Sequence, residues 1–559
     1  MKVRSLYALG LVTALLVFAS CSKTNEQGKM IPKDAALVIT IDGKSLGDKL
    51  PWNEIKSNVA FQEMLADSTL PKHMRKILDN PDSSGMDIHK DIVFFLQQDS
   101  TSGYVALQGT LKDAAAFKRF NQNLLITDKV REQEGISYMK NGDGCVAWND
   151  KQFMYLANSP GLGKRKYNWE NADGETETHV EKKQDMEQIC QSLFNLSSSK
   201  SLAKEERFSK LMAETGDMHF WMNAEVFSRM MDYPKAMLLF NLEKLYKGSV
   251  NTATLSFEKG KIQIVSHNYA SPAILDILEK HKGGKINEAL IGKLPSDNVQ
   301  ILVTASYKPE ALREMMKLFN VDGYLNIAAA KLGFSMDDFV KANKGDFLFA
   351  ITDVANKKRA DSIIYGEYEP NPGESMPDAK IYFATSIGDK DAFNKLINAG
   401  NKLGGNLFGG VGEKIAYSSD GNVFVLSNNK AQTDQFIATK GKQPAFLNRL
   451  SGEAIGAYVN IQSLMKAAGT DRISDSVSRK VFDLSFNLWE DILMKGGTVT
   501  DGASSSVIEI NLKDKNVNSL QQLNHYFSDL AAIKKEQDKK QKEEMMALED
   551  LVEPAQTIK

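Results

Sequence analysis

Short apolar runs recur along the chain, and turn residues separate them. Residues 37–41, 153–158, 299–303 and 423–428 are examples, and their content of Val, Ile, Phe and Leu predicts β-strands. These runs are half apolar rather than continuously apolar. That pattern favours sheets with one face on a core and the other face in water.

The second half of the chain repeats landmarks of the first half in the same order. Each half shows a Pro-x-Asp segment before a strand, an Asp-capped helix, a strand ending in an Asn turn, a strand ending in Asn, and a closing hairpin. They stand at 31–41, 110–120, 153–158, 219–223 and 252–266, and again at 294–303, 386–396, 423–428, 456–460 and 497–512. Fixed-order self-similarity is typical of duplication, so we predict related halves at 31–290 and 291–530.

Strands alternate with short helices in both halves, but hairpins recur, as around Gly260 and Asp501-Gly502. We therefore predict an α+β fold of two related halves, each a mixed or mainly antiparallel sheet with helices packed on one face. Extra polar and charged residues predict an insertion in the first half near 160–208. Residues 531–559 are rich in Lys, Glu, Gln and Met, which predicts a charged helical or disordered tail.

The N-terminus has the three regions of a signal peptide. A basic start is followed by a mostly apolar run at 6–18, which is shorter than the ~20 residues of a membrane span. The small residues Ala19 and Ser20 then suit a cleavage site directly before Cys21.

Residues 17–21 resemble a bacterial lipobox, with Phe where Leu is commonest. We predict a signal peptide at 1–20, lipidation of Cys21 and a lipidated tether at 21–30. The alternative is an ordinary signal peptide that ends beside a cysteine. Lipid on Cys21 implies the membrane as a partner and a location in the bacterial cell envelope.

The charge balance bears on the kind of partner, and the cysteine content bears on disulfide bonding. Lys and Arg number 69 and Asp and Glu 71, which gives a formal net charge of -2. A nucleic-acid binder usually carries a basic excess, so we expect no nucleic-acid partner. Cys145 and Cys190 form either one disulfide in an oxidising compartment or, as we expect, two separate buried thiols.

No motif for catalysis, cofactor binding or metal binding is complete. The histidines include no i, i+3 or i, i+4 pair, and no Cys-x-x-Cys occurs. The glycine-rich runs at 161–165 and 409–414 lack the rest of a phosphate loop. Residues 80–91 match part of a calcium loop, but the first and last ligands depart from it, so we favour a turn at Gly85. We expect no catalytic, cofactor-binding or metal-binding residue.

In residues 31–34, 52–56 and 81–88 the chain resembles an uncharacterised family of cell-envelope lipoproteins from Gram-negative gut anaerobes, known as a domain of unknown function. The resemblance covers nearly the whole chain after the signal peptide. It implies an envelope location and no substrate. The lack of an acidic run after Cys21 favours the periplasmic face of the outer membrane over the cell surface.

These observations predict a membrane-anchored envelope protein that is not an enzyme and that binds a partner, protein or glycan, or acts as a scaffold. Such a protein should show no cluster of ionisable residues. Alternatives are a carbohydrate- or peptide-binding module, which should expose tryptophans such as Trp52 and Trp169 in one line, and an unrecognised hydrolase.

Overall fold

The computed structural model describes residues 26–70, 72–98, 102–125, 129–159, 184–230, 241, 243–358, 375–407, 415–439, 443–469, 473 and 475–552. The chain divides into two compact units. The first comprises Met1–Ser45, Pro71–Asp232 and Thr252–Thr254, and the second comprises Leu46–Leu70, Tyr233–Asn251 and Leu255–Lys559.

The first unit is built on an antiparallel sheet with the strand order β8–β1–β2–β3–β7–β6–β5–β4. Its strands are β1 (Leu37–Ile41), β2 (Ile92–Gln98), β3 (Gly103–Thr110), β4 (Arg131–Gln133), β5 (Ile136–Asn141), β6 (Gly144–Trp148), β7 (Gln152–Ser159) and β8 (Met218–Asn223). Glu134 and Gly135 join β4 to β5 with φ values of 53° and 74°. Two positive φ angles give the turn whose twist matches that of the flanking strands.

The helices of this unit are α2 (Gly43–Lys49, at the unit boundary), α5 (Lys72–Asp79), α6 (Ala114–Leu125), α7 (Met186–Phe194), α8 (Glu206–Ala213) and α9 (Ala224–Met230), with short 3-10 turns η1 (Glu26–Gly28), η2 (Pro81–Ser84) and η3 (Leu202–Lys204). Three of these helices, α6, α7 and α8, bury residues spaced three or four apart. In α7, Met186, Cys190 and Leu193 are buried, which is the spacing of one helix face. The chain already packs at its described start, because Ile31 is fully buried.

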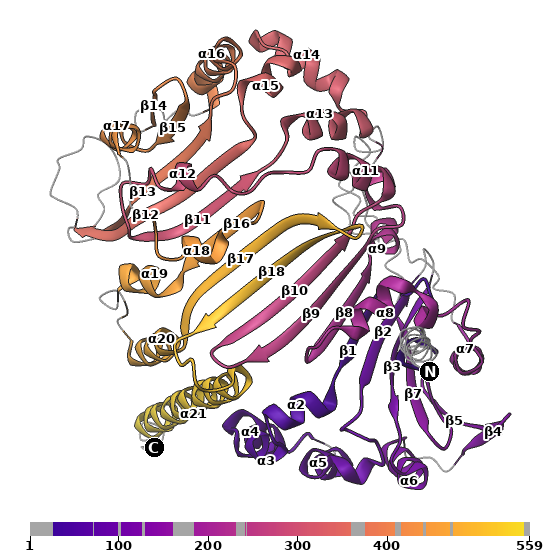
Figure 1. Ribbon diagram of the computed structural model, residues 1–559. Coiled ribbons are helices and arrows are strands. Elements are labelled where there is room, and N and C mark those ends of the chain that lie inside the picture. Colours follow the sequence, from indigo (N-terminus) through magenta and orange to yellow (C-terminus); the bar gives the residue numbers. More distant parts are fainter. Residues whose placement is uncertain are drawn as a thin grey trace, which may run out of the picture. The chain divides into compact units, whose positions relative to one another are not determined.

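The second unit has a longer antiparallel sheet with the order β14–β15–β13–β12–β11–β16–β17–β18–β10, and β10 also pairs with β9 (Figure 1). Its strands are β9 (Val250–Glu258), β10 (Lys261–Tyr269), β11 (Val299–Ser306), β12 (Asp346–Lys358), β13 (Ser375–Ser386), β14 (Ala416–Ser419), β15 (Val423–Ser427), β16 (Ile455–Asn460), β17 (Trp489–Thr500) and β18 (Ala503–Leu512). The predicted hairpin turn at Asp501 and Gly502 joins β17 to β18, again with two positive φ angles.

Three helices of the second unit close its main core over one face of the sheet. These are α12 (Glu288–Ile291), α17 (Lys430–Ala438) and α18 (Leu447–Leu450), and they contribute Leu290, Phe436, Leu447 and Leu450 to the core. The unit's other helices are α3 (Trp52–Ser57), α4 (Val59–Ala66), α10 (Glu243–Tyr246), α11 (Pro272–Lys280), α13 (Pro309–Leu318), α14 (Asp322–Leu332), α15 (Met336–Ala342), α16 (Lys390–Leu407), α19 (Ile461–Ala468), α20 (Ser476–Leu488) and α21 (Ser519–Val552).

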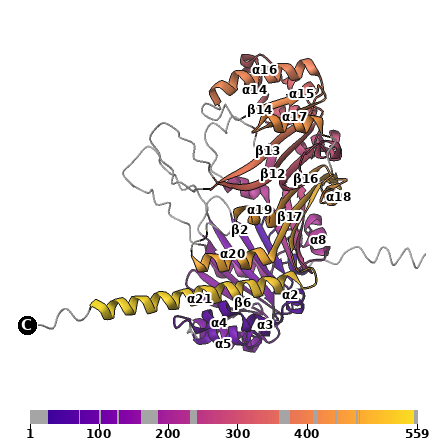
Figure 2. The same cartoon turned by 90° about the vertical axis from the view of Figure 1, so that its left-hand side faces the viewer.

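The long helix α21 ends the described chain (Figure 2). Its first turns pack on α20, where the hydroxyls of Ser485 and Tyr526 are 2.8 Å apart, and on α4, where Asn58 donates to Asn524 at 2.8 Å. Farther along, Met545 and Met546 are exposed. Among the described helices none is both long and apolar enough to cross a membrane.

The structure confirms the predicted α+β class, and the described strand pairings are antiparallel. The order β8–β1–β2–β3–β7 of the first unit recurs as β16–β11–β12–β13–β15 in the second, and each predicted landmark is an element at the corresponding place. This correspondence favours duplication. The boundaries at 290 and 530 stay predictions, because the compact units divide the chain elsewhere.

Two predicted segments are described only in part. Of the insertion near 160–208, residues 160–183 lie outside the described residues, and the rest forms α7, η3 and the start of α8. The predicted tail begins inside α21, which continues to Val552, and residues 553–559 lie outside the described chain.

Candidate functional site

The two faces of the second unit's sheet differ in what covers them. Side chains alternate between the faces along each strand. The face under α12, α17 and α18, here called the covered face, holds core residues that are between 0% and 7% exposed: Leu302, Leu348, Ala350, Tyr382, Ala384, Val425, Tyr458 and Leu493. The intervening residues point to the opposite side, here called the open face.

The open face carries two rows of apolar side chains, each running across seven strands. Strand register places the members of a row opposite one another, from β13 through β12, β11, β16, β17 and β18 to β10 (Figure 1). The first row is Phe383, Phe349, Val303, Ala457, Met494, Ile508 and Ile264, and the second is Ile381, Ile351, Ile301, Val459, Ile492, Ile510 and Ile262.

These rows remain in contact with solvent. Phe383 is 40% exposed and Ile381 is 37% exposed, and only Ile262 of the fourteen residues is classed as buried. Six steps between strands at about 4.8 Å make the rows roughly 29 Å wide. Neither row contains a charged or hydrogen-bonding side chain. Contiguous apolar surface of this kind usually marks an interaction site.

The first unit shows the same feature on a smaller scale. Two rows cross β8, β1, β2 and β3: Phe220, Ile39, Phe94 and Leu107, and Met222, Leu37, Leu96 and Val105. Leu107 is 37% exposed, and the other seven residues are partly exposed. The opposite side chains of these strands, such as Val38, Phe95 and Trp221, are at most 1% exposed.

The sequence did not predict this open apolar face. We expected a wet, polar face because the strands are only half apolar. The structure shows that several of the polar residues are buried instead: Gln300, Thr304 and Thr352 are at most 1% exposed. Buried polar groups need hydrogen-bond partners, and Thr304 donates to the carbonyl of Phe347 at 2.8 Å.

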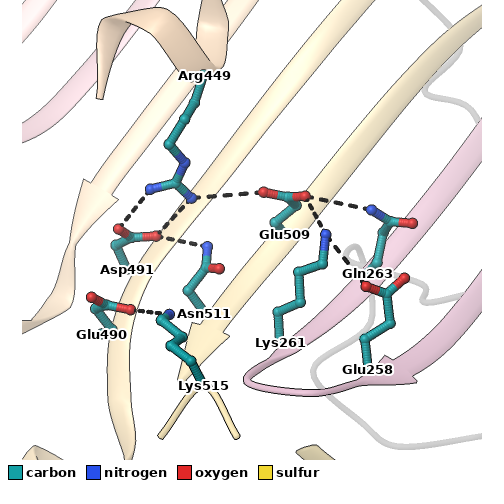
Figure 3. A network of polar contacts seen from close by, with 9 residues as sticks. All are labelled: Glu258, Lys261, Gln263, Arg449, Glu490, Asp491, Glu509, Asn511 and Lys515. Atoms are coloured by element: carbon teal, nitrogen blue, oxygen red, sulfur yellow. Dashed lines mark hydrogen bonds and ion pairs between the residues drawn. The ribbon is translucent and has the colours of Figure 1, made fainter. Parts of the chain in front are cut away.

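A network of ion pairs lies at one end of the covered face (Figure 3). Arg449 of α18 makes a forked contact with Asp491 of β17, at 3.0 and 3.2 Å, and a longer one of 3.7 Å with Glu509 of β18. Glu509 also accepts from Lys261 of β10 at 2.7 Å, and Asn511 donates to Asp491 at 2.8 Å. Charges of opposite sign are therefore matched across three strands.

Burial and pairing together set the charge states in this network. Burial alone would raise the pKa of the Glu509 carboxyl, but the hydrogen bond and charge of Lys261 outweigh it and lower that pKa. The pKa of Lys261 is raised, because its contacts with Glu509 outweigh the opposite effect of burial. The pKa of Arg449 is raised in the same way by Asp491. Lys261 and Glu509 therefore both stay charged, as a structural link requires.

This network shows that the expectation of no clustered ionisable residues is wrong. The reason is strand register, which brings together residues far apart in sequence, such as Lys261 and Glu509. The same two strands also place His267 opposite Ser505, and the Nδ1 atom of the histidine lies 2.8 Å from the serine Oγ. A serine and a histidine in contact are two of the groups that a hydrolase needs.

A hollow of about 640 Å³ lies beside α19, lined by Asn298, Val354, Ala355, Asn460, Gln462, Ser463, Lys466, Ala467 and Gly469. Much of its polar lining is satisfied within the protein. Ser463 donates to Asn298 at 3.0 Å and accepts from Gln300 at 2.8 Å, and Gln462 donates to the carbonyls of Phe486 and Trp489 at 2.6 and 2.5 Å. These internal contacts make the hollow a weaker candidate than the open face.

The structure describes only some of the residues that the sequence analysis singled out. Cys21 lies outside the described residues. Cys145 and Cys190 are free, buried thiols, as we expected. The part of the chain that is described holds no group of three or more His, Cys, Asp or Glu side chains arranged to bind a metal.

The calcium-like segment at 80–91 is a turn. Gly85 has a φ of 79°, and its carbonyl accepts from the backbone N–H groups of Lys112 and Asp113 at 2.9 and 3.1 Å. A side chain there would meet the carbonyl of Asp113 at 2.3 Å, so only glycine fits. The carboxylates face different partners, with Asp82 toward Lys112 and Asp91 toward Gln27.

The described tryptophans form no exposed line. Trp148 and Trp221 are at most 4% exposed. Trp52 packs edge-on against Phe61 at 5.5 Å, and Trp489 packs against Tyr526 at 6.1 Å. Trp169 lies outside the described residues.

A model of the family described as "Domain of unknown function (DUF4836)" matches residues 28–355, more than half of the chain. The chain belongs to this family. The DUF4836 match begins where the described chain starts to pack and ends within β12. It confirms the predicted membership of a domain-of-unknown-function family.

Other comparisons add little to the DUF4836 assignment. No curated protein matches the chain. Two solved structures, crystal forms IV and I of the protein TP0453, align with it at 13% identity each. They cover 45% and 43% of this chain and 84% and 76% of theirs, with TM-scores of 0.25 and 0.23. At such TM-scores the likeness supports no conclusion about fold or function.

Proposed function

We propose that this protein is a lipid-anchored, non-enzymatic protein of the bacterial cell envelope that binds another protein through the open apolar face. The observation that carries the binding role is the pair of apolar rows across seven strands of the second unit. Their recurrence across β8, β1, β2 and β3 supports it, because the feature belongs to both units.

The chemistry of the rows favours a protein partner with an apolar surface of its own. A nucleic acid or a charged glycan needs cationic or hydrogen-bonding groups, and the rows offer none. A neutral glycan usually stacks on exposed aromatic rings, and the rows are mostly aliphatic. A width of roughly 29 Å suits a standard protein interface of about 800 Å² per partner.

The Arg449 network favours a structural rather than a catalytic role for its charged residues. In the Arg449 network each acid faces a base, so its charges hold α18 on the sheet. The His267–Ser505 pair is the best starting point for the hydrolase alternative. If Ser505→Ala abolishes a hydrolytic activity found in a broad substrate screen, the non-enzymatic proposal fails.

The anchor is tested separately from the binding face. We propose that Cys21 carries lipid and holds the protein at the periplasmic face of the outer membrane. Lipid anchoring predicts that the wild-type chain pellets with envelope membranes and that Cys21→Ala is released in folded form. A Cys21→Ala protein that still pellets with membranes contradicts the anchor.

The binding face is tested by the size of the complex in detergent-solubilised envelopes. Phe383→Asp puts a charge at the most exposed position of the apolar rows, on β13, and we expect it to shift the protein from a large complex to the free chain. Lys430→Glu is the control, because Lys430 lies on α17 over the covered face and its side chain is 62% exposed. Equal migration of the wild type and Phe383→Asp, or a complex that contains only copies of this chain, contradicts the proposal.

A further inference from the structure

Two cysteines of the first unit lie between the sheet and a helix. Cys145 is on β6, where it pairs with Leu156 of β7, and Cys190 is on α7. Helix α7 packs on β5, β6 and β7, and its buried residues Met186, Cys190 and Leu193 face the sheet. Cys145 is 1% exposed and Cys190 is fully buried, so each thiol points into the same packed layer.

Val146, the next residue on β6, belongs to the core that includes Phe117 of α6, so the side chain of Cys145 points to the opposite side of the sheet. Tyr138 of β5 lies opposite Ala147, which is on the same side of β6 as Cys145, and it is 5% exposed. Burial, with smaller contributions from Cys190 and Cys145, raises the pKa of Tyr138 to about 12. Two buried cysteines on directly packed elements, with side chains in the same layer, meet a first geometric condition for a disulfide.

We propose that Cys145 and Cys190 form a structural disulfide bond in the mature protein. This inference rests on the proposed envelope location, because disulfides persist in the periplasm and are rare in the cytosol. The bond would close a loop from residue 145 to residue 190 and link α7 covalently to β6.

The bond forms by exchange with the disulfide of an external thiol oxidant. One cysteine thiolate attacks a sulfur of the oxidant, whose own S–S bond breaks, and a mixed disulfide results. The second thiolate then displaces the oxidant from the first sulfur. The two cysteines lose two protons and two electrons in total, and the oxidant leaves as a dithiol. Since both sulfurs are buried in the folded unit, the exchange takes place before α7 has docked.

Differential thiol labelling of the full chain tests the inference. Envelopes are dissolved in a denaturant that contains one maleimide, and the protein is then reduced and treated with a second maleimide. Mass spectrometry reads the Cys21, Cys145 and Cys190 peptides separately. We expect Cys145 and Cys190 to carry only the second label and to appear as one linked pair before reduction. In Cys145→Ser, Cys190 should carry the first label.

A refolding experiment tests the disulfide independently of the proposed envelope location. The reduced, denatured chain is refolded in a mixture of reduced and oxidised glutathione, and its cysteines are read in the same way. Formation of the Cys145–Cys190 bond there supports the inference even if fractionation places the chain in the cytosol. First-label modification of both cysteines in envelope protein, free thiols after refolding, or a bond from either cysteine to Cys21 overturns it. Reduction of the bond should lower the thermal midpoint by on the order of 10 °C.

Discussion

The two faces of the second unit's sheet are made of similar residues but have different surroundings. Tyr382 and Phe383 are neighbours on β13, and the first is fully buried while the second is 40% exposed. Leu493 and Ile492 show the same contrast on β17. Hydrophobicity therefore does not distinguish the faces. The difference is that α12, α17 and α18 cover one face, and the apolar rows on the other retain contact with solvent.

The largest expected effect is the difference in stability lost when the neighbouring side chains Tyr382 and Phe383 are truncated. Tyr382→Ala removes a ring stacked at 5.8 Å on Phe436 and leaves a cavity in the core. We expect it to lower the free energy of unfolding by about 3–5 kcal/mol. Phe383→Ala should cost about 1 kcal/mol, because much of this ring already faces solvent. Urea unfolding measures both, and equal losses would show that the open face is also packed in the isolated protein.

The second contrast is between neighbouring acids at the end of the covered face. Asp491 pairs with Arg449 and its side chain is 10% exposed, whereas Glu490 pairs with Lys515 and is 39% exposed. Asp491→Ala leaves Arg449 and Asn511 without their partner and should lower the free energy of unfolding by about 2 kcal/mol. Glu490→Ala should change it by at most about 1 kcal/mol. A larger loss for Glu490→Ala would contradict the role assigned to the network.

The smallest expected effect is a change in pH dependence. The pKa of Glu509 is lowered in the folded protein, so its ionised form stabilises the fold above its unfolded pKa of about 4.3. That stabilisation is lost as the pH falls through the lower folded pKa. Glu509→Gln should cost about 1 kcal/mol at pH 7. The difference between Glu509→Gln and wild type should shrink on acidification below about pH 4.3. A difference that is constant between pH 7 and pH 3 would contradict the charged Lys261–Glu509 pair.

The sequence predicted the fold class and the order of the elements along the chain because local patterns determine them. Alternating apolar residues marked β11 and β15, and Asp501 with Gly502 marked the hairpin between β17 and β18. The repeated landmarks lie at corresponding places in the two units, but the order of the strands within each sheet was not predicted.

The candidate surface could not be predicted in the same way, because no local signal says which face a helix covers. Both faces of β13 read as apolar in Ile381, Tyr382 and Phe383, and the coverage depends on helices encoded far away, such as α18. The ion-pair network likewise joins residues that only the strand register brings together. Cys145 and Cys190 share one buried layer only because α7 packs on β6. Charge counts and cysteine spacing carry no such information.

Site-specific photo-crosslinking in intact cells tests the central claim most directly. A photoreactive amino acid at Phe383 reports contacts of the open face, and the same amino acid at Lys430 reports contacts above the covered face. The account predicts one discrete crosslinked product with another envelope protein from position 383 and none from position 430. Crosslinks from 430 but not from 383, or crosslinks from 383 only to lipid or to a second copy of this chain, would contradict it.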